Sequence, residues 1–251
     1  MAVKLFERVE SGKGLIYNAL TSLLILLLFP RMDHPGVMLL ERAGIVALTF
    51  GLIALYQTFP CRLTAFVRMA VQMSLLAYWY PDTFEFNRLF PNLDYIFATV
   101  EQGLFGCQPS VEFSKHCPSI WFSEPFNMGY FFYYPMILVV TVWYFLTHFE
   151  WFEKICFVLV TSFFIWNDYL VPGPGYDQGF FYQLVEASQE VGERPTAAFP
   201  SSHVAISTIV MIMAWRVSRK LAAVLAPFYV LLCCATVYIQ AHYLVDSLVG
   251  L

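Results

Sequence analysis

Long apolar stretches restrict the fold of this chain more than any other feature of its sequence. They fall near residues 14–30, 36–57, 63–80, 126–148, 153–171, 203–217 and 219–241. A helix of about 20 apolar residues crosses the hydrocarbon core of a bilayer, and each stretch is close to that length. Because lipid offers no hydrogen bonds, a chain that crosses it must pair its own backbone groups. We therefore expect an all-α, polytopic transmembrane helical bundle.

The composition agrees with a membrane setting. Hydrophobic residues make up 59% of the 251 residues and charged residues only 13%, and the mean hydropathy is +0.62. The crossings use most of the chain, which leaves little for a second folded domain. The net charge of −4 includes no long basic run, so nothing supports a nucleic-acid partner. An eighth apolar stretch begins near Val245, and we expect this last helix to be truncated at Leu251.

Lysine and arginine in the connections predict the orientation, because basic loops resist translocation. If the N-terminus is cytoplasmic, eight basic residues fall on that side: Lys4, Arg8, Lys13, Arg62, Lys154, Arg216, Arg219 and Lys220. Only four fall on the far side: Arg31, Arg88, Lys115 and Arg194. The same count of crossings places loops 81–125 and 172–202, together with His242, outside the cytoplasm.

The outer loop 81–125 is too polar to cross the membrane. An apolar spacing within it predicts an amphipathic helix on the membrane surface, with one face formed by Leu93, Ile96, Phe97, Val100 and Leu104. Cys107 and Cys117 also lie in this loop, where an oxidising compartment would allow a disulfide. Two free thiols remain an equal alternative.

Some polar residues inside apolar stretches have ordinary structural explanations. Pairing between helices or snorkelling to the surface accounts for Glu41, Arg42 and Arg68. An aromatic belt at the membrane interface is favoured over a place in the site for Tyr130, Tyr133 and Tyr134.

His242 and Asp246 carry the strongest chemical signal. Their i,i+4 spacing at the start of a helix puts both side chains on one face. There the carboxylate can hold one imidazole nitrogen protonated and leave the other as a nucleophile or base. A chance pair or a helix cap is the structural alternative for each residue alone.

His203 follows the segment "PSS" at the predicted start of another helix. Ser201 or Ser202 can cap this helix, and its unpaired N–H groups can hold an anion. Arg194 supplies a guanidinium suited to phosphate oxygens. Since ionisable groups near lipid are costly, their joint presence on one membrane face favours a phosphate site over chance. The arginine and the helix ends provide positive charge, so we expect neither metal nor cofactor.

Weaker candidates lie before this site in the chain. Asn167 and Asp168 end the stretch 153–171, and Tyr176 and Asp177 follow them. Hydrogen bonds to a polyhydroxyl headgroup are one role for these residues, and capping of a helix is the favoured alternative.

At this point the segments "RP", "FPSSH" and "HYLVD" resemble the type 2 phosphatidic acid phosphatase (PAP2) superfamily. Its signature is KxxxxxxRP, PSGH and SRxxxxxHxxxD. The resemblance covers roughly residues 63–251 and implies a six-helix core, with residues 1–62 as an added N-terminal helix pair. It assigns catalysis to His242, Asp246 and His203, and phosphate binding to Arg194 together with Ser201 and Ser202.

The sequence departs from this signature in informative places. The family's lysine falls on Ala187, its glycine on Ser202, and its serine–arginine pair on Ala235 and Thr236. A phosphomonoester carries nearly two negative charges and favours several cations, whereas a phosphodiester lipid carries one. The segment "ATVYIQAHYLVD", with threonine where the phosphatases keep arginine, is similar to the branch of inositol phosphorylceramide synthases and, more distantly, sphingomyelin synthases.

The resemblance implies a membrane lipid phosphotransferase that works through a phosphohistidine. Its donor would be a glycerophospholipid, such as phosphatidylinositol, and its acceptor a ceramide or a related lipid. A bacterial inner membrane with a periplasmic site fits the predicted orientation. A PAP2-type phosphatase acting on a phosphomonoester lipid is the near alternative. A non-catalytic membrane protein that uses the His/Asp pair as a proton site is the farther one.

Overall fold

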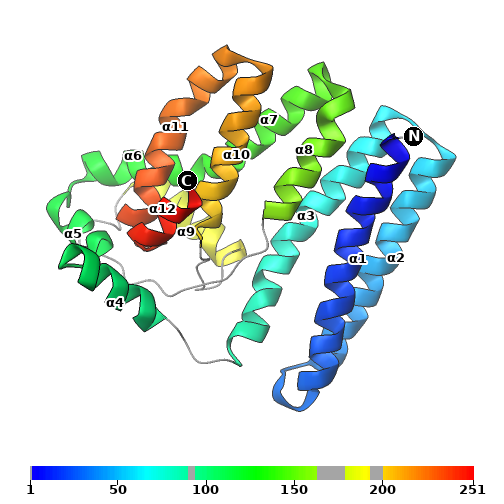
Figure 1. Ribbon diagram of the computed structural model, residues 1–251, viewed down its shortest axis with the longest axis horizontal. Helices are drawn as coiled ribbons and strands as arrows, with labels where there is room; N and C mark the ends of the chain where they lie inside the picture. The colour runs from blue at the N-terminus through cyan, green and yellow to red at the C-terminus, as the bar shows by residue number, and fades with distance from the viewer. Residues whose placement is uncertain (1, 90–93, 163–178, 193–199) are drawn as a thin grey trace. The chain divides into compact units, whose positions relative to one another are not determined.

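The computed structural model of the protein describes residues 2–89, 94–162, 179–192 and 200–251. Every regular element in these ranges is a helix, which confirms the all-α class (Figure 1). The chain divides into two compact units, Met1–Phe90 and Pro91–Leu251. The sequence predicted a division after residue 62, whereas the boundary between these units lies after the third helix. A domain boundary at residue 62 stays a prediction.

The N-terminal unit consists of three long helices and a short connection: α1 (Ala2–Leu28), the 3-10 helix η1 (Phe29–Arg31), α2 (Pro35–Thr58) and α3 (Arg62–Asn87). Arg42 of α2 is almost fully buried within it. Its Nε donates to Thr21 Oγ1 on α1 at 3.1 Å, and one terminal nitrogen donates to the Met38 carbonyl at 3.1 Å. The expected pairing between helices is therefore observed for this arginine.

The C-terminal unit contains nine described helices: α4 (Asp94–Phe105), α5 (Pro109–His116), α6 (Ile120–Phe131), α7 (Tyr133–Thr147), α8 (Phe149–Ser162), α9 (Phe180–Gly192), α10 (Ser202–Val217), α11 (Arg219–Tyr238) and α12 (Leu244–Gly250). Helix α11 packs against α6 and α10, while α10 also contacts α7 and α8. Helix α12 returns against α10 and α11, and α4 lies against α12.

A glycine permits a close contact between two helices of this unit. A Cβ atom added at Gly129 of α6 would lie 2.5 Å from the Cβ of Leu231 and 2.6 Å from its backbone carbon on α11. Small residues let helix backbones approach in this way inside membranes. This close approach keeps the C-terminal end of α6, which carries Tyr130, beside the C-terminal half of α11.

Four helical segments among the described residues are long and apolar enough to cross a membrane: Gly14–Arg31, Pro35–Thr58, Ile120–Thr147 and Arg219–Tyr238. They coincide with four of the predicted stretches, although the third segment begins at Ile120 and not near residue 126. The predicted stretch 203–217 forms the shorter apolar helix α10. Helix α3 is long, but it is not among the candidate crossings. Stretch 153–171 is described only as far as Ser162.

The outer loop 81–125 is largely helical. The predicted amphipathic helix forms as α4, and its apolar side chains Ile96, Val100 and Leu104 are exposed, as a face resting on lipid would be. Its location on the membrane surface stays a prediction. Cys107 and Cys117 are both free thiols in this structure, so the equal alternative to a disulfide is the one observed.

Candidate active site

The start of α10 is fixed by the serine that precedes it. Ser201 is fully buried, and its hydroxyl accepts from the Val204 N–H at 3.4 Å, as the N-cap of the helix. Its carbonyl accepts the Ala205 N–H at 2.9 Å. Such a cap satisfies one of the backbone donors that a helix start leaves unpaired. His203 therefore leaves the first turn of α10 in a defined direction.

A tight turn joins α11 to α12 and carries His242. Gln240 adopts a left-handed backbone with φ of 59°, which reverses the chain after Ile239. The His242 N–H then donates to the Thr236 carbonyl at 2.9 Å, one turn back on α11. Local backbone bonds thus fix the position of the histidine before any side chain contributes.

His242 and Asp246 face one another, as their spacing predicts. Nδ1 of His242 lies 3.8 Å from Oδ2 of Asp246, and both side chains are buried, with 3% and 0% exposed. The distance exceeds that of a hydrogen bond but places a negative charge beside Nδ1. A carboxylate in this position favours a proton on Nδ1 and leaves Nε2 as the nucleophilic nitrogen.

A backbone hydrogen bond joins the two motifs directly. The Ser201 N–H donates to the Asp246 carbonyl at 3.1 Å. Gly250 permits this contact, because a Cβ atom added there would meet the Ser201 carbonyl at 2.9 Å and the Val204 Cβ at 3.1 Å. The start of α10 and the short helix α12 therefore form one packed unit.

This packing brings the two histidines together. The ring centroids of His203 and His242 are 5.7 Å apart, and His203 is 7% exposed. Tyr130 and Tyr133 contact the His203 ring, with centroid distances of 4.7 and 4.6 Å. Both tyrosines are buried, so the interfacial belt favoured for them is wrong, because their rings pack on this histidine. Tyr134 is 43% exposed.

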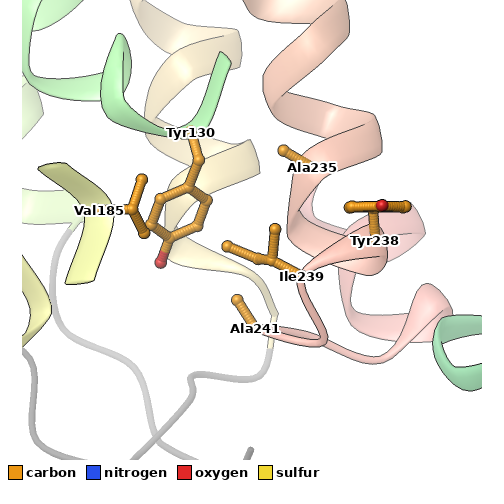
Figure 2. Close-up of a cluster of buried hydrophobic side chains, with 6 residues drawn as sticks. All are labelled: Tyr130, Val185, Ala235, Tyr238, Ile239 and Ala241. Carbon is orange, nitrogen blue, oxygen red and sulfur yellow. The ribbon is translucent and has the colours of Figure 1, made fainter. Parts of the chain in front are cut away.

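A cluster of buried hydrophobic side chains packs around the turn that leads to His242. The cluster consists of Tyr130, Val185, Ala235, Tyr238, Ile239 and Ala241. Figure 2 shows Tyr130 of α6 and Val185 of α9 on the side toward which Ile239 and Ala241 point, with Tyr238 on the other side of α11. The Tyr238 hydroxyl also donates to the Cys117 carbonyl at 2.8 Å, which connects α11 to the outer segment. Packing from both sides thus restricts the turn.

The positions that depart from the family signature are occupied by small side chains. Thr236 is fully buried, and its hydroxyl lies 3.1 Å from the Ser247 hydroxyl and donates to the Cys233 carbonyl at 2.9 Å. This threonine joins α11 to α12 where the signature has a cation. Ala187 is exposed on α9, and Ser202 is partly exposed at the first position of α10.

Several predicted site residues lie outside the described residues. These are the phosphate ligand Arg194, with its neighbour Pro195, and the headgroup candidates Asn167, Asp168, Tyr176 and Asp177. The described site thus consists of His203, His242 and Asp246 with the two serines. Among the described residues, no group of three or more histidines, cysteines or acids has the geometry to hold a metal ion.

Sequence reasoning missed one buried acid beside this site. Glu101 of α4 is 0% exposed, and its Oε1 accepts the Val245 N–H at 3.0 Å. Burial raises the pKa of this carboxyl, and the nearby charge of Asp246 acts in the same direction. The signal in the sequence is a lone glutamate four residues after Phe97, at the margin of the apolar face of the predicted amphipathic helix.

Comparison with known proteins agrees with this geometry. The family model described as PAP2 superfamily matches residues 177–251, which contain both motifs. No curated protein and no solved structure gave a significant match. The matched segment includes the start of α10 and the turn before α12, where the buried histidines meet. Residues 177–251, less than a third of the chain, are therefore similar to the PAP2 superfamily.

Proposed function

We propose that this protein is a membrane phosphotransferase that moves a phosphorylated headgroup, such as inositol phosphate, from a glycerophospholipid to a ceramide. The observation that carries the proposal is the convergence of three buried groups. The His203 and His242 rings lie 5.7 Å apart, and Asp246 lies 3.8 Å from Nδ1 of His242. Two histidines and one carboxylate at such distances can supply a nucleophile, its orienting partner and an acid.

In the first step, Nε2 of His242 attacks the phosphorus of the donor lipid. A nitrogen–phosphorus bond forms as the bond from phosphorus to the diacylglycerol oxygen breaks. His203 gives its proton to that oxygen, so diacylglycerol leaves as a neutral alcohol. Asp246 stabilises the positive charge that develops on the His242 ring. Arg194 and the N–H groups at the start of α10 hold the phosphoryl oxygens.

In the second step, the primary hydroxyl of ceramide attacks the phosphohistidine. An oxygen–phosphorus bond forms, the nitrogen–phosphorus bond breaks, and His203 accepts the hydroxyl proton. Both histidines return to their starting states, so the cycle is complete without net proton transfer. The sequence-predicted orientation places this reaction at the periplasmic face of a bacterial inner membrane.

The positions that depart from the family signature support a phosphodiester donor. Thr236 and Ala187 occupy the places of an arginine and a lysine, so neither position adds a cation. The hydroxyl of Thr236 is already within bonding distance of Ser247. A site with fewer cations suits a donor that carries one negative charge. Phosphatidylinositol is such a donor, and ceramide presents a primary hydroxyl at a similar depth in the membrane.

The direct test is transfer by the purified chain in detergent. Phosphatidylinositol and labelled ceramide should give labelled inositol phosphorylceramide with the wild type and none above background with His242→Ala. His116→Ala is the matched control, because His116 is exposed on α5 and should leave the rate unchanged. Conversion retained by His242→Ala would overturn the proposed mechanism.

The covalent intermediate has a test of its own. With donor labelled at phosphorus and no acceptor, the wild type should hold label that is stable in alkali and lost in acid, as expected for a phosphoramidate. Addition of ceramide should release that label as product. Label absent from an enzyme that still turns over would show that ceramide attacks the donor directly.

The second candidate is a lipid phosphatase, and the family match favours it equally at the level of the superfamily. Water would then replace ceramide in the second step, with the same groups in the first. Phosphatidic acid is the discriminating substrate, because its hydrolysis releases inorganic phosphate. Rapid phosphate release together with no ceramide product would replace the transferase proposal with the phosphatase.

A further inference from the structure

Glu101 is buried on a helix whose other side chains are mainly exposed. Its exposed fraction is 0%, whereas the neighbouring Val100 and Leu104 are 40% and 67% exposed. Burial of a carboxyl group without compensating contacts is costly, so its place calls for a physical reason. The reason lies in what this side chain contacts.

The carboxyl group completes the start of α12. Oε1 of Glu101 accepts the N–H of Val245 at 3.0 Å, while Tyr243, the N-cap residue of α12, makes no side-chain capping bond. A helix start leaves such backbone donors unpaired unless a side chain accepts from them. Here the acceptor comes from another helix, far away in the sequence.

A second contact fixes the same pair of helices. The rings of Phe97 on α4 and Tyr243 stack with centroids 5.9 Å apart and an interplanar angle of 26°. Phe97 and Glu101 are four residues apart, so both side chains lie on one face of α4. This face therefore contacts α12 at two successive points.

Helix α12 depends on such contacts because it is short. It contains seven residues, and a helix of this length is not stable without packing partners. Asp246 lies in its first turn, next to Val245. A shift of the start of α12 would therefore change the distance between Asp246 and His242.

Glu101 contacts the start of α12 through one oxygen of its carboxyl group. Burial raises the pKa of this carboxyl, while the hydrogen bond from the Val245 N–H acts in the opposite direction. Oε2 has no hydrogen-bond partner among the described residues. The amide oxygen of a glutamine, which has a similar shape, can accept the same Val245 N–H.

We propose that Glu101 is a positioning residue, which fixes the start of α12 so that Asp246 keeps His242 oriented for attack on phosphorus. The inference rests on the proposed role of His242 and adds a group from α4, outside the segment that matches the family model. It assigns to the outer segment a function in catalysis through the geometry of the C-terminal motif.

The test compares Glu101→Ala with Glu101→Gln in the transfer assay. Alanine should lower kcat by about 10- to 100-fold with KM changed less than about threefold, because a misplacement near 1 Å costs about this much in rate. Glutamine keeps an acceptor oxygen and should remain within about threefold of the wild type. Gln102→Ala, the exposed neighbour, is the control and should leave both constants unchanged. An unaffected alanine variant, or glutamine as damaging as alanine, would overturn the inference.

A second measurement needs no turnover. Hydrogen exchange of the peptide spanning residues 240–251 should accelerate in Glu101→Ala and stay protected in Glu101→Gln, while the α10 peptide 204–217 remains unchanged. If the wild type transfers nothing, the proposed function fails and exchange still tests the contact. If Glu101→Ala fails to fold, Glu101→Asp replaces it, because its shorter carboxylate should lose the Val245 bond. Unchanged protection of this peptide in Glu101→Ala, or in Glu101→Asp where that variant replaces it, contradicts the inference.

Discussion

The two units of the molecule bury polar side chains in different ways. In the N-terminal unit, Arg42 is held by Thr21 on the adjacent helix and by the Met38 carbonyl in its own helix. In the C-terminal unit, His203 and His242 come from the ends of different helices and meet at 5.7 Å, with the carboxylate of Asp246 beside them. Burial alone does not distinguish Arg42 from the two histidines, because all three side chains are polar and buried.

This difference distinguishes a buried polar residue that stabilises the fold from buried groups that can take part in a reaction. Two of the bonds of Arg42 end on a hydroxyl and a carbonyl, groups that do not ionise at neutral pH. In contrast, His203, His242 and Asp246 can accept and donate protons. They come together from segments about forty residues apart in the sequence. A buried charge therefore indicates a site only when titratable groups meet around a common point.

Among the variants that test this difference, Asp246→Asn is expected to have the largest effect. The asparagine amide can donate to Nδ1 of His242 and so favour the tautomer with its proton on Nε2, which removes the nucleophile. We expect kcat to fall by about 10²- to 10⁴-fold, with little change in thermal stability. The measurement is single-turnover transfer, with Glu112→Gln as control. A variant with near-normal kcat would remove Asp246 from the mechanism.

Gly250→Val should damage both stability and rate. Its Cβ would meet the Ser201 carbonyl at 2.9 Å, so α12 must move away from α10. Overpacking of this kind costs about 1–3 kcal/mol. Thermal unfolding in detergent and kcat should both decline. Gly103→Val is the matched control, since no atom lies within 4 Å of its added Cβ; equal effects of the two variants would contradict the close contact.

Arg42→Met should affect stability alone. The change leaves Thr21 and the Met38 carbonyl without a charged donor, at a cost of about 1–3 kcal/mol. We expect a lower Tm and an unchanged specific activity of the folded fraction. A selective loss of kcat at normal Tm would break the comparison, because it would give the N-terminal unit a part in the chemistry.

The smallest effect concerns the exposed pair of Asp33 and Arg88, 2.6 Å apart. The hydrogen bond from Arg88 lowers the pKa of the Asp33 carboxyl. A lowered pKa means that the pair stabilises the fold above the ordinary aspartate pKa of about 3.9 and loses this contribution as the pH falls through the folded value. The Tm difference between wild type and Asp33→Asn should be small at pH 7 and shrink as the pH falls below the ordinary aspartate pKa. A difference that grows in acid contradicts this sign.

Much of the fold follows from apolar periodicity. The stretches at 14–30, 36–57 and 219–241 lie within a few residues of the apolar segments long enough to cross a membrane, since lipid crossing fixes both length and composition. The third crossing begins earlier than expected because Ser119 caps α6, and this helix continues through Pro125. Local capping decided that boundary, and hydropathy carries little information about it.

Part of the candidate site could also be predicted, because it depends on local spacing along the sequence. The spacing of His242 and Asp246 fixes their common face, and the serine before His203 is a recognisable cap. The contacts of Tyr130, Tyr133 and Glu101 depend on how separate helices pack, which no local pattern records. Tyrosines near a membrane interface favour a belt on general grounds. Tyr130 is buried directly after Gly129, where α6 approaches α11 closely.

The bond between the Ser201 N–H and the Asp246 carbonyl has a consequence for the tolerance of the site to sequence change. It joins two main-chain atoms that nineteen of the twenty residue types would supply, and proline alone lacks the donor. The separation of the two motifs is therefore insensitive to which side chains occupy these positions. Substitutions nearby, such as serine for glycine at position 202, can alter the shape offered to a headgroup while the distance between the histidines is retained.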